Sequence, residues 1–151
     1  MEAIIFIGIQ ATGKSTFYKE IFFKSHVRVN LDMLKTRHRE KLLLRACIEM
    51  KQPFVVDNTN PTKEDRQRYI DLAKEKKFKI IGYYFSSEIS QCIERNRKRP
   101  DSEQIPERGI KGTYSKLELP DYAEGFDELH YVKANQNGRF EVSAWEIKNE
   151  V

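Results

Sequence analysis

The stretch GIQATGKST, residues 8–16, decides how this chain folds, because an apolar run precedes it and a helical pattern follows it. Its spacing fits the Walker A pattern G-x-x-x-x-G-K-[ST], which is met here by Gly8, Gly13, Lys14 and Ser15. Glycines let backbone N–H groups turn inward around an anion, and the following helix presents its positive end to that anion. The stretch therefore predicts a strand, a phosphate-binding loop and a helix, in that order.

The ligand expected in this loop is a nucleotide triphosphate. Lys14 is expected to reach the β- and γ-phosphates, and Ser15 is expected to bind Mg²⁺. Because the chain contains no guanine-reading N-K-x-D sequence, a GTPase is disfavoured and ATP is the expected nucleotide. The full set of expected nucleotide-binding residues, including two arginines from a later segment, is Gly8, Ala11, Thr12, Gly13, Lys14, Ser15, Thr16, Arg95 and Arg99.

Apolar runs alternate with helical patterns along the rest of the chain, which indicates a parallel α/β sheet. We expect strands at residues 3–7, 27–29, 54–57 and 78–85, with two late strands at 126–132 and 140–147. We expect helices at residues 14–24, 32–50, 62–76 and 107–117, and another that Ser86 or Ser87 caps and that ends before Pro100. The residues expected to face the core from the first two helices are Phe17, Ile21, Leu34, Leu42, Leu43, Ala46 and Met50, with Phe22 as a further candidate.

Length and composition point to one globular domain that covers residues 1–151. The net charge of +4 and the pI of about 9.0 allow an anionic partner, and the oligomeric state stays open. The N-terminal apolar run is too short for a signal peptide or a membrane span, so we expect a cytoplasmic protein with no membrane partner. Cys47 and Cys92 have neither metal-ligand nor C-x-x-C spacing, so both are expected to be reduced, buried thiols.

The stretch VNLDMLKTRHR, residues 29–39, follows a short expected strand and opens a helix. Asp32 would lie at the carboxyl edge of the sheet, where ligands bind in open α/β folds, and is the candidate general base on an acceptor hydroxyl. Lys35 is three residues further on, on the same expected helix face, where it would bind an anionic group of the acceptor. The alternative is a helix-start carboxylate with a solvated lysine.

A second polar cluster lies in PFVVDNTNPTKEDR, residues 53–66, where an apolar strand ends in Asp57. A carboxylate at this position orients Mg²⁺ directly or through water. The small polar residues after it are placed to hydrogen-bond an acceptor, so the expected acceptor-binding set is Asp32, Lys35, Asp57, Asn58, Thr59 and Asn60. The alternative is a plain turn before the N-cap residue Thr62, since asparagine and proline favour turns.

The stretch CIERNRKRP, residues 92–100, carries Arg95 and Arg99 four residues apart, on one face of an expected helix. A polar segment follows, so residues 95–110 have the composition of a lid that closes over a triphosphate and places both guanidiniums against it. Arg97 and Lys98 are expected to point elsewhere. The alternative is an ordinary solvated charge run.

Together these segments resemble the P-loop kinase module of the polynucleotide 5′-hydroxyl kinases, the phage and animal end-healing enzymes. GIQATGKST, VNLDML, VVDNTNPTKEDR and RNRKR match that family's pattern in order and in spacing, and the resemblance runs from Met1 to Val132. The fold it implies is α/β, a three-layer P-loop kinase fold with a mostly parallel sheet of order 2-3-1-4-5 and a helical lid.

The resemblance also implies roles for single residues. Lys14 and Ser15 handle phosphates and Mg²⁺, Asp32 is the general base, and Asp57 lies at the acceptor pocket or the metal. Arg95 and Arg99 act from the lid. One departure is Lys35, because the family commonly has an arginine there, and lysine lacks the planar fork that holds a phosphate bidentately. No D-x-D-x-T motif is present, so no 3′-phosphatase activity is expected.

The expected function is transfer of the ATP γ-phosphate to a 5′-hydroxyl of DNA or RNA, as in nucleic acid repair, with ATP and Mg²⁺ as cofactors. A nucleic acid 5′-OH end is the expected partner. One alternative is a small-molecule kinase acting on a nucleoside, sugar or antibiotic hydroxyl, which Lys35 and the short chain favour. Another is a nucleotide-binding regulator with weak ATPase activity, against which Asp32 argues.

Overall fold

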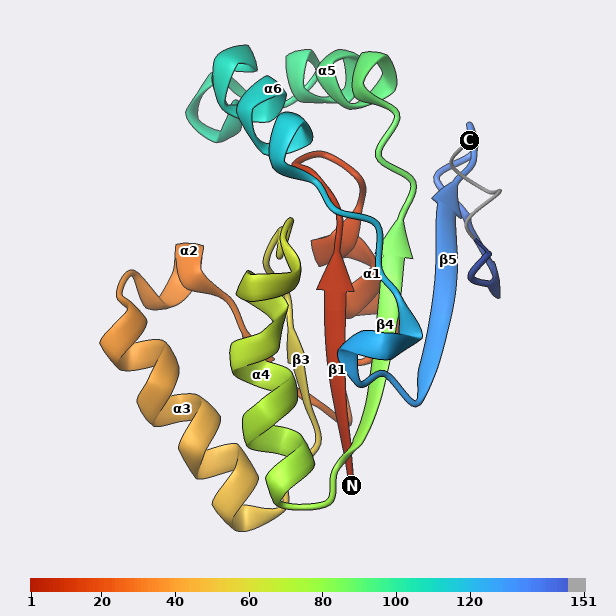
Figure 1. The fold of residues 1–151 in the computed structure, drawn as a ribbon. Coiled ribbons are helices and arrows are strands. Elements are labelled where there is room, and N and C mark those ends of the chain that lie inside the picture. The colour runs from red at the N-terminus through yellow and green to blue at the C-terminus, as the bar shows by residue number, and fades with distance from the viewer. Residues whose placement is uncertain (147–151) are drawn as a thin grey trace.

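In the computed structural model, which describes residues 1–146, six strands form one sheet in the order β2-β3-β1-β4-β5-β6 (Figure 1). The strands are β1 (Glu2–Ile7), β2 (Val27–Val29), β3 (Phe54–Val56), β4 (Lys79–Phe85), β5 (Glu128–Ala134) and β6 (Phe140–Ala144). The first five pair in parallel and β6 pairs with β5 antiparallel. The expected order of five parallel strands is confirmed, and β6 extends it by one edge strand. Residue 147, the end of the expected last strand, lies outside the described residues.

Helices cover both faces of the sheet, and two more lie above its carboxyl edge (Figure 1). The helices are α1 (Lys14–Ile21), α2 (Leu31–Leu34), α3 (Arg37–Met50), α4 (Lys63–Glu75), α5 (Ile89–Arg97) and α6 (Glu107–Lys116), with 3-10 turns η1 (Asp101–Glu103) and η2 (Tyr122–Glu124). Among residues 1–146, none of these helices combines the length and the apolar character that crossing a lipid bilayer demands.

Two apolar cores follow from the alternation of side chains along the central strand β1. Ile5 and Ile7 face one side, where they meet Leu44 of α3 and Tyr69 of α4. On the other side Phe6 packs against α1, with its ring 5.9 Å from the ring of Phe17 at a steep angle. The three expected layers are therefore α3 and α4, the sheet, and α1.

The start of α4 forms as its sequence predicts. The hydroxyl of Thr62 accepts a hydrogen bond from the backbone N–H of Asp65, and the Asp65 carboxylate accepts one back from Thr62 N. This capping box satisfies two of the N–H groups that every helix start leaves free. The free thiols of Cys47 and Cys92 are buried, also as expected.

The long helix expected at residues 32–50 was wrong, because the chain breaks it after one turn. Lys35 ends α2 with a φ of 75°, and the hydroxyl of Thr36 caps α3 by accepting from Arg39 N at 3.1 Å. The break resets the helical face, so the buried residues of α3 include Leu44, Cys47 and Ile48. Of the residues expected to face inward, Leu42 is 53% exposed and Met50 is 65% exposed.

Two shorter expectations were also wrong. Helix α1 stops at Ile21, short of the expected residue 24, and Ile21 is 56% exposed, whereas the further candidate Phe22 is buried. Neither serine before α5 caps that helix, because Glu88 is its N-cap residue. Ser87 instead lies under the loop after β1, where its hydroxyl accepts from Ile9 N at 3.1 Å and donates to Phe85 O.

Candidate active site

The loop after β1 needs its two glycines because other parts of the chain lie against it. A Cβ atom at Gly8 would lie 3.0 Å from the Cβ of Phe85, and one at Gly13 would lie 2.8 Å from Cε1 of Phe140. Gly13 also has a φ of 93° where it caps α1. A side chain at position 8 would crowd Phe85 of β4, and one at position 13 would require the Phe140 ring to move and would strain the backbone, so the loop shape depends on both glycines.

Lys14 is folded into the loop that precedes it. Its Nζ donates to the carbonyl oxygens of Gly8 at 2.9 Å and Ile9 at 2.6 Å, and to the hydroxyl of Thr12 at 3.2 Å. Burial lowers the pKa of Lys14 from 10.5 to about 8, against the opposing attraction of Asp57. The side chain of Lys14 is only 9% exposed, because three loop oxygens take the place of water around the ammonium group.

A cavity of about 330 Å³ opens between this loop, the start of α2 and the end of β3. It brings together most of the residues predicted from sequence, namely residues 11–16 of the loop, Asp32, Asp57, Asn58, Thr59 and Arg99. Gly8, Lys35, Asn60 and Arg95 are not among the lining residues. The phosphate-binding loop and the candidate base therefore face one common space.

Ser15 and Asp57 form an oxygen-rich corner of this cavity. The Ser15 hydroxyl donates to Oδ2 of Asp57 at 3.2 Å, and Asp57 is 2% exposed. A hydroxyl and a carboxylate are the ligands that Mg²⁺ prefers, so the chemistry of this pair fits the expected metal. Across residues 1–146, no group of three or more His, Cys, Asp or Glu side chains is arranged to hold a metal ion. A metal at this corner would complete its coordination with nucleotide oxygens and water.

Arg28, which sequence reasoning missed, contacts both members of that corner. Its Nε donates to Oδ2 of Asp57 at 2.8 Å and its Nη2 donates to the Ser15 hydroxyl at 2.9 Å. No local signal marks it, because Arg28 reaches Asp57 only when β2 and β3 lie side by side in the sheet.

Asp32 lies exposed in the first turn of α2, and two asparagines hold that turn in place. Asn30 caps it by accepting from Met33 N at 3.0 Å, and its Nδ2 donates to the backbone oxygen of Asp57 at 2.6 Å. Asn58 accepts from Leu31 N at 2.9 Å. The Asn30 cap was missed, although asparagine before an acidic first turn is a usual helix-start signal.

The amide group of Asn58 is held from behind by a buried polar cluster. Its Nδ2 donates to Oε2 of Glu40 at 3.1 Å and to the hydroxyl of Tyr69 at 3.3 Å. Arg37 pairs with the 3% exposed Glu40 at 2.8 Å. Burial, then the charge of Glu40, raises the pKa of Tyr69 to about 12, which keeps its hydroxyl a donor. Because Glu40 and Tyr69 bind the Nδ2 group of Asn58, its Oδ1 atom is the one that faces α2 and accepts from Leu31 N.

The remaining predicted acceptor-binding residues are placed differently. The backbone oxygen of Thr59 accepts from Gly8 N at 3.0 Å, which ties the turn to the loop. Asn60 is 4% exposed and its Nδ2 donates to the backbone oxygen of Phe6, beneath the loop. Lys35 is exposed at the C-terminal end of α2, where it is the C-cap residue, and it is not among the residues that line the cavity with Asp32.

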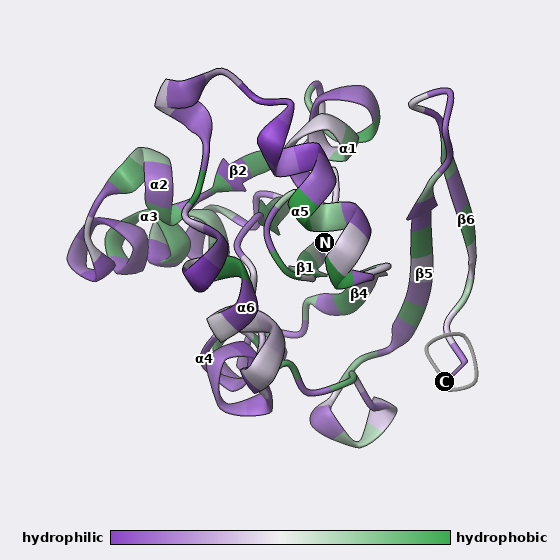
Figure 2. Ribbon diagram, turned by 90° about the horizontal axis from the view of Figure 1, so that it is seen from above, coloured by the Kyte–Doolittle hydropathy of each residue, from purple (hydrophilic) through white to green (hydrophobic). Residues whose placement is uncertain are grey.

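Helices α5 and α6, with η1 between them, pack over the loop through Ile9, Cys92 and Ile110. The connecting segment is drawn mainly in the hydrophilic colour in Figure 2. Gln10 of the loop donates to the hydroxyl of Thr113 in α6 at 2.9 Å. Its Oε1 is buried and finds no hydrogen-bond partner within the described part of the chain, and the sequence analysis did not single this residue out.

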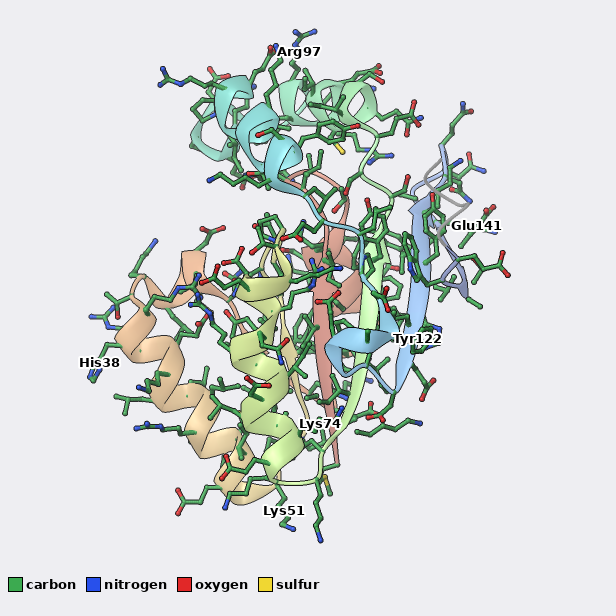
Figure 3. The ribbon with its side chains drawn as sticks, viewed as in Figure 1. His38, Lys51, Lys74, Arg97, Tyr122 and Glu141 are labelled. Carbon is green, nitrogen blue, oxygen red and sulfur yellow. The ribbon has the colours of Figure 1, made fainter. Side chains whose placement is uncertain are left out.

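The two arginines predicted to share a helix face are separated, because α5 ends at Arg97 and Arg99 lies beyond it. Arg99 lines the first cavity, whereas Arg95 donates to Ala11 O at 3.2 Å and lines a second cavity of about 930 Å³. Arg97 points away on the outer side of α5, as expected, and pairs with Glu107 of α6 (Figure 3).

The second cavity adjoins the first. Gly13 and Thr16 line both, and the far wall of the second is formed by Phe140 and by the turn between β5 and β6. The two cavities together therefore extend from the phosphate-binding loop to the edge hairpin.

Comparison with known proteins shows the family and the fold of this chain. The model of the AAA domain family matches residues 4–120. The bifunctional polynucleotide phosphatase/kinase of Schizosaccharomyces pombe is 31% identical over 138 residues, which is 87% of this chain and 33% of that protein. The L-seryl-tRNA(Sec) kinase of Methanococcus maripaludis is 25% identical and covers 91% of this chain, which spans 68% of that protein. The chain thus spans about a third of the first relative.

Among solved structures, a gluconokinase from Sinorhizobium meliloti 1021 superposes with a TM-score of 0.65 at 18% identity and covers 89% of this chain and 83% of its own. Kti12 of Chaetomium thermophilum, solved with ADP-AlF3, superposes with a TM-score of 0.66 at 14% identity, and the match covers 90% of this chain and 92% of Kti12. At these identities the likeness shows the fold: a mostly parallel P-loop kinase sheet.

Proposed function

The chain belongs to the AAA domain family and has a P-loop kinase fold, and from this premise we propose that it transfers the γ-phosphate of ATP to a 5′-hydroxyl of a polynucleotide. One observation carries the proposal: Lys14, the Ser15–Asp57 pair and Asp32 line a single cavity. A protein that only senses a nucleotide needs no carboxylate opposite its phosphate-binding loop, whereas a phosphotransferase needs a group that orients or deprotonates the acceptor hydroxyl.

Each side chain has a distinct part in this reaction. The loop N–H groups and Lys14 bind the phosphates, and Arg99 neutralises charge on the transferred group. Ser15 and Asp57 would hold Mg²⁺, which supplies further positive charge at the phosphate oxygens. Asp32 accepts a hydrogen bond from the acceptor hydroxyl and orients it for attack on the γ-phosphorus. As the new ester bond forms, Asp32 takes up the proton of the hydroxyl, the bond between the γ-phosphorus and the bridging oxygen breaks, and ADP leaves.

The second cavity is the proposed place of the nucleoside. It shares Gly13 and Thr16 with the phosphate cavity, so a base and ribose attached to the bound phosphates lie within reach. Phe140 and the Arg95 guanidinium offer surfaces against which a flat base packs. Residues 95–110 are the proposed lid, since they lie over both cavities and carry Arg99.

The polynucleotide acceptor is supported by the relatives named polynucleotide phosphatase/kinase and by the net charge of +4, which favours an anionic substrate. One observation favours a small-molecule acceptor instead. Lys35, the predicted contact to the acceptor's phosphate, lies outside the cavity. The second candidate function is therefore phosphorylation of a nucleoside or sugar hydroxyl.

Labelled ATP decides between these functions. The protein is incubated with γ-labelled ATP and Mg²⁺ together with a 5′-OH oligonucleotide, a nucleoside panel or a sugar panel, and Asp32→Asn serves as the inactive control. The proposal predicts label on the oligonucleotide 5′ end. Label confined to a nucleoside or a sugar would replace it with the second candidate, and release of free phosphate alone would identify a nucleotide-binding ATPase.

A further inference from the structure

Arg28 supplies a cation at the corner where a metal is expected. It extends from the edge strand β2, and its guanidinium bridges Asp57 Oδ2 at 2.8 Å and the Ser15 hydroxyl at 2.9 Å. These are the same two oxygen atoms that would bind Mg²⁺. The ring of Tyr18 lies 5.9 Å from the Arg28 Cζ, which further steadies the guanidinium.

Burial explains why this corner needs a cation. The Asp57 side chain is 2% exposed, whereas the Arg28 side chain is 26% exposed. A carboxylate removed from water is costly unless it is paired and hydrogen-bonded. Lys14 is a second cation near Asp57, and its hydrogen bonds go to loop oxygens instead. Arg28 therefore carries the direct pairing of this carboxylate.

The corner does not form a complete metal site by itself. It offers one carboxylate and one hydroxyl, whereas Mg²⁺ requires six oxygen ligands and keeps several waters. A metal ion arriving alone would have to displace a bound guanidinium for two protein ligands. A metal ion arriving on a nucleotide brings phosphate oxygens as further ligands, so it can replace Arg28 with less loss.

We propose that Arg28 is a resident cation that makes metal binding depend on nucleotide binding. It neutralises Asp57 in the free protein. When Mg²⁺ arrives with ATP, Arg28 releases Asp57 Oδ2 and the Ser15 hydroxyl, and both oxygens then bind the metal. Where metal is absent, its guanidinium remains beside the loop and serves as the counter-charge for the phosphates of ATP. This inference rests on the proposed function, because it requires that ATP binds at the loop.

Nucleotide affinity with and without metal tests this role. The dissociation constant of a fluorescent ATP analogue is measured by anisotropy in excess Mg²⁺ and in EDTA, for wild type, Arg28→Gln and Arg28→Lys. In Arg28→Gln we expect metal-free binding to weaken about tenfold or more, since a charged partner is lost, while Mg²⁺-bound binding is unchanged or tighter. We compare the proteins by one ratio, the dissociation constant in EDTA divided by the dissociation constant in Mg²⁺. Arg28→Lys keeps the charge but loses the planar guanidinium, so its ratio should lie between those of wild type and Arg28→Gln.

Arg45→Gln is the matched control, because Arg45 is an exposed arginine on α3 whose loss changes the net charge equally. Its ratio should equal that of wild type. Equal weakening of both affinities in Arg28→Gln would overturn the proposal and leave Arg28 a structural residue. Arg28→Lys replaces Arg28→Gln in this test if the circular dichroism spectrum shows that Arg28→Gln does not fold. If Arg28→Lys binds the ATP analogue more weakly by the same factor in EDTA and in Mg²⁺, its ratio equals that of wild type and the proposed role is contradicted.

A direct metal titration gives a second readout. Mn²⁺ binding to the nucleotide-free protein, followed by electron paramagnetic resonance, should be stronger in Arg28→Gln than in wild type, because no guanidinium competes for the two oxygens. Identical Mn²⁺ binding in both proteins would contradict the proposal. Failure of the ATP analogue to bind wild type under either condition would instead reject the proposed function, so the two failures can be told apart.

Discussion

Asn30 donates a hydrogen bond from Nδ2 to the backbone oxygen of Asp57 at 2.6 Å, so a side chain at the end of β2 is tied to the end of β3. The same asparagine caps α2, which carries Asp32. Asn30, which is 6% exposed, therefore connects the oxygen-rich corner at Asp57 to the candidate base Asp32.

Asn30→Ala should lower the free energy of unfolding by about 1–3 kcal/mol, because it removes a helix cap and leaves a buried carbonyl unpaired. Turnover should fall further than stability alone explains, since α2 loses its anchor while the loop stays intact. Urea unfolding and steady-state kinetics measure the two effects. Thr62→Ala, which removes the cap of α4, is the control that should lose stability and keep turnover. Equal turnover in both variants would contradict the positioning role.

Nucleotide affinity should depend on pH through Lys14, whose pKa is lowered to about 8 by burial. Above this pH the ammonium of the free protein loses its proton, so ATP affinity should fall, and Lys14→Met should show weak, pH-independent binding. Stability should change in the opposite direction. Between about 8 and 10.5 the unfolded chain holds a proton that the native chain has lost, so the free energy of unfolding rises with pH. A flat affinity profile across this range would exclude Lys14 as the titrating group.

Asp32→Asn should reduce turnover by roughly 10²–10⁴, the usual range for loss of a general base, while ATP affinity stays nearly intact. The asparagine keeps the size of the side chain and its place in α2, so the fold should not change. Single-turnover kinetics and nucleotide titration separate chemistry from binding. A large loss of ATP affinity with unaltered turnover at saturation would make Asp32 a nucleotide ligand.

Arg99 and Arg95 should differ, because they line different cavities. Arg99→Ala should lower kcat, since its guanidinium faces the phosphate cavity. Arg95→Ala should mainly raise the KM for ATP, since Arg95 lines the proposed nucleoside cavity and braces Ala11. Arg97 lies on the outer side of α5, the helix that also carries Arg95, so Arg97→Ala is the control and should leave kcat and the KM for ATP near wild type. Matching kinetic defects in the first two variants would argue against separate cavities for them.

Lys35 discriminates the acceptor classes. If it contacts a polynucleotide phosphate, Lys35→Ala should raise the acceptor KM by an amount that shrinks as salt rises, and Lys35→Arg should preserve or tighten binding. Acceptor KM for a 5′-OH oligonucleotide, measured for the three proteins at low and high salt, gives the answer. Because Lys35 lies at the exposed end of α2, its effect should be smaller than that of Asp32. No change in KM at either salt concentration would remove Lys35 from the acceptor contact.

Features specified by neighbouring residues could be predicted from the sequence. The phosphate-binding loop and the Thr62 cap depend on residues within one turn of each other. The alternating pattern was enough to predict a parallel sheet, whereas the order of its strands came from the resemblance to P-loop kinases. Asp32 and Asp57 were placed at the same cavity because the carboxyl ends of parallel strands meet at one edge.

Features that depend on tertiary contacts could not be predicted. Nothing in the sequence near Lys35 marks the positive φ that divides the expected helix, because neither glycine nor proline occurs there. The pairing of Arg28 with Asp57 requires two strands that are distant in the chain to be neighbours. Asn60 looked like an acceptor ligand because its type fits, but its side chain is used on the backbone of Phe6.

The contact between Gly13 and Phe140 has a consequence for how the chain matures. The ring of Phe140 lies 5.2 Å from that of Phe17 and fills the space that a side chain at position 13 would need. A chain emerging from the ribosome exposes its phosphate-binding loop long before the hairpin strand that packs against it is made. Contacts this distant in sequence slow folding, so the loop should gain its final rigidity late, when synthesis has passed residue 140. ATP binding by nascent chains should therefore begin only at lengths that include this strand.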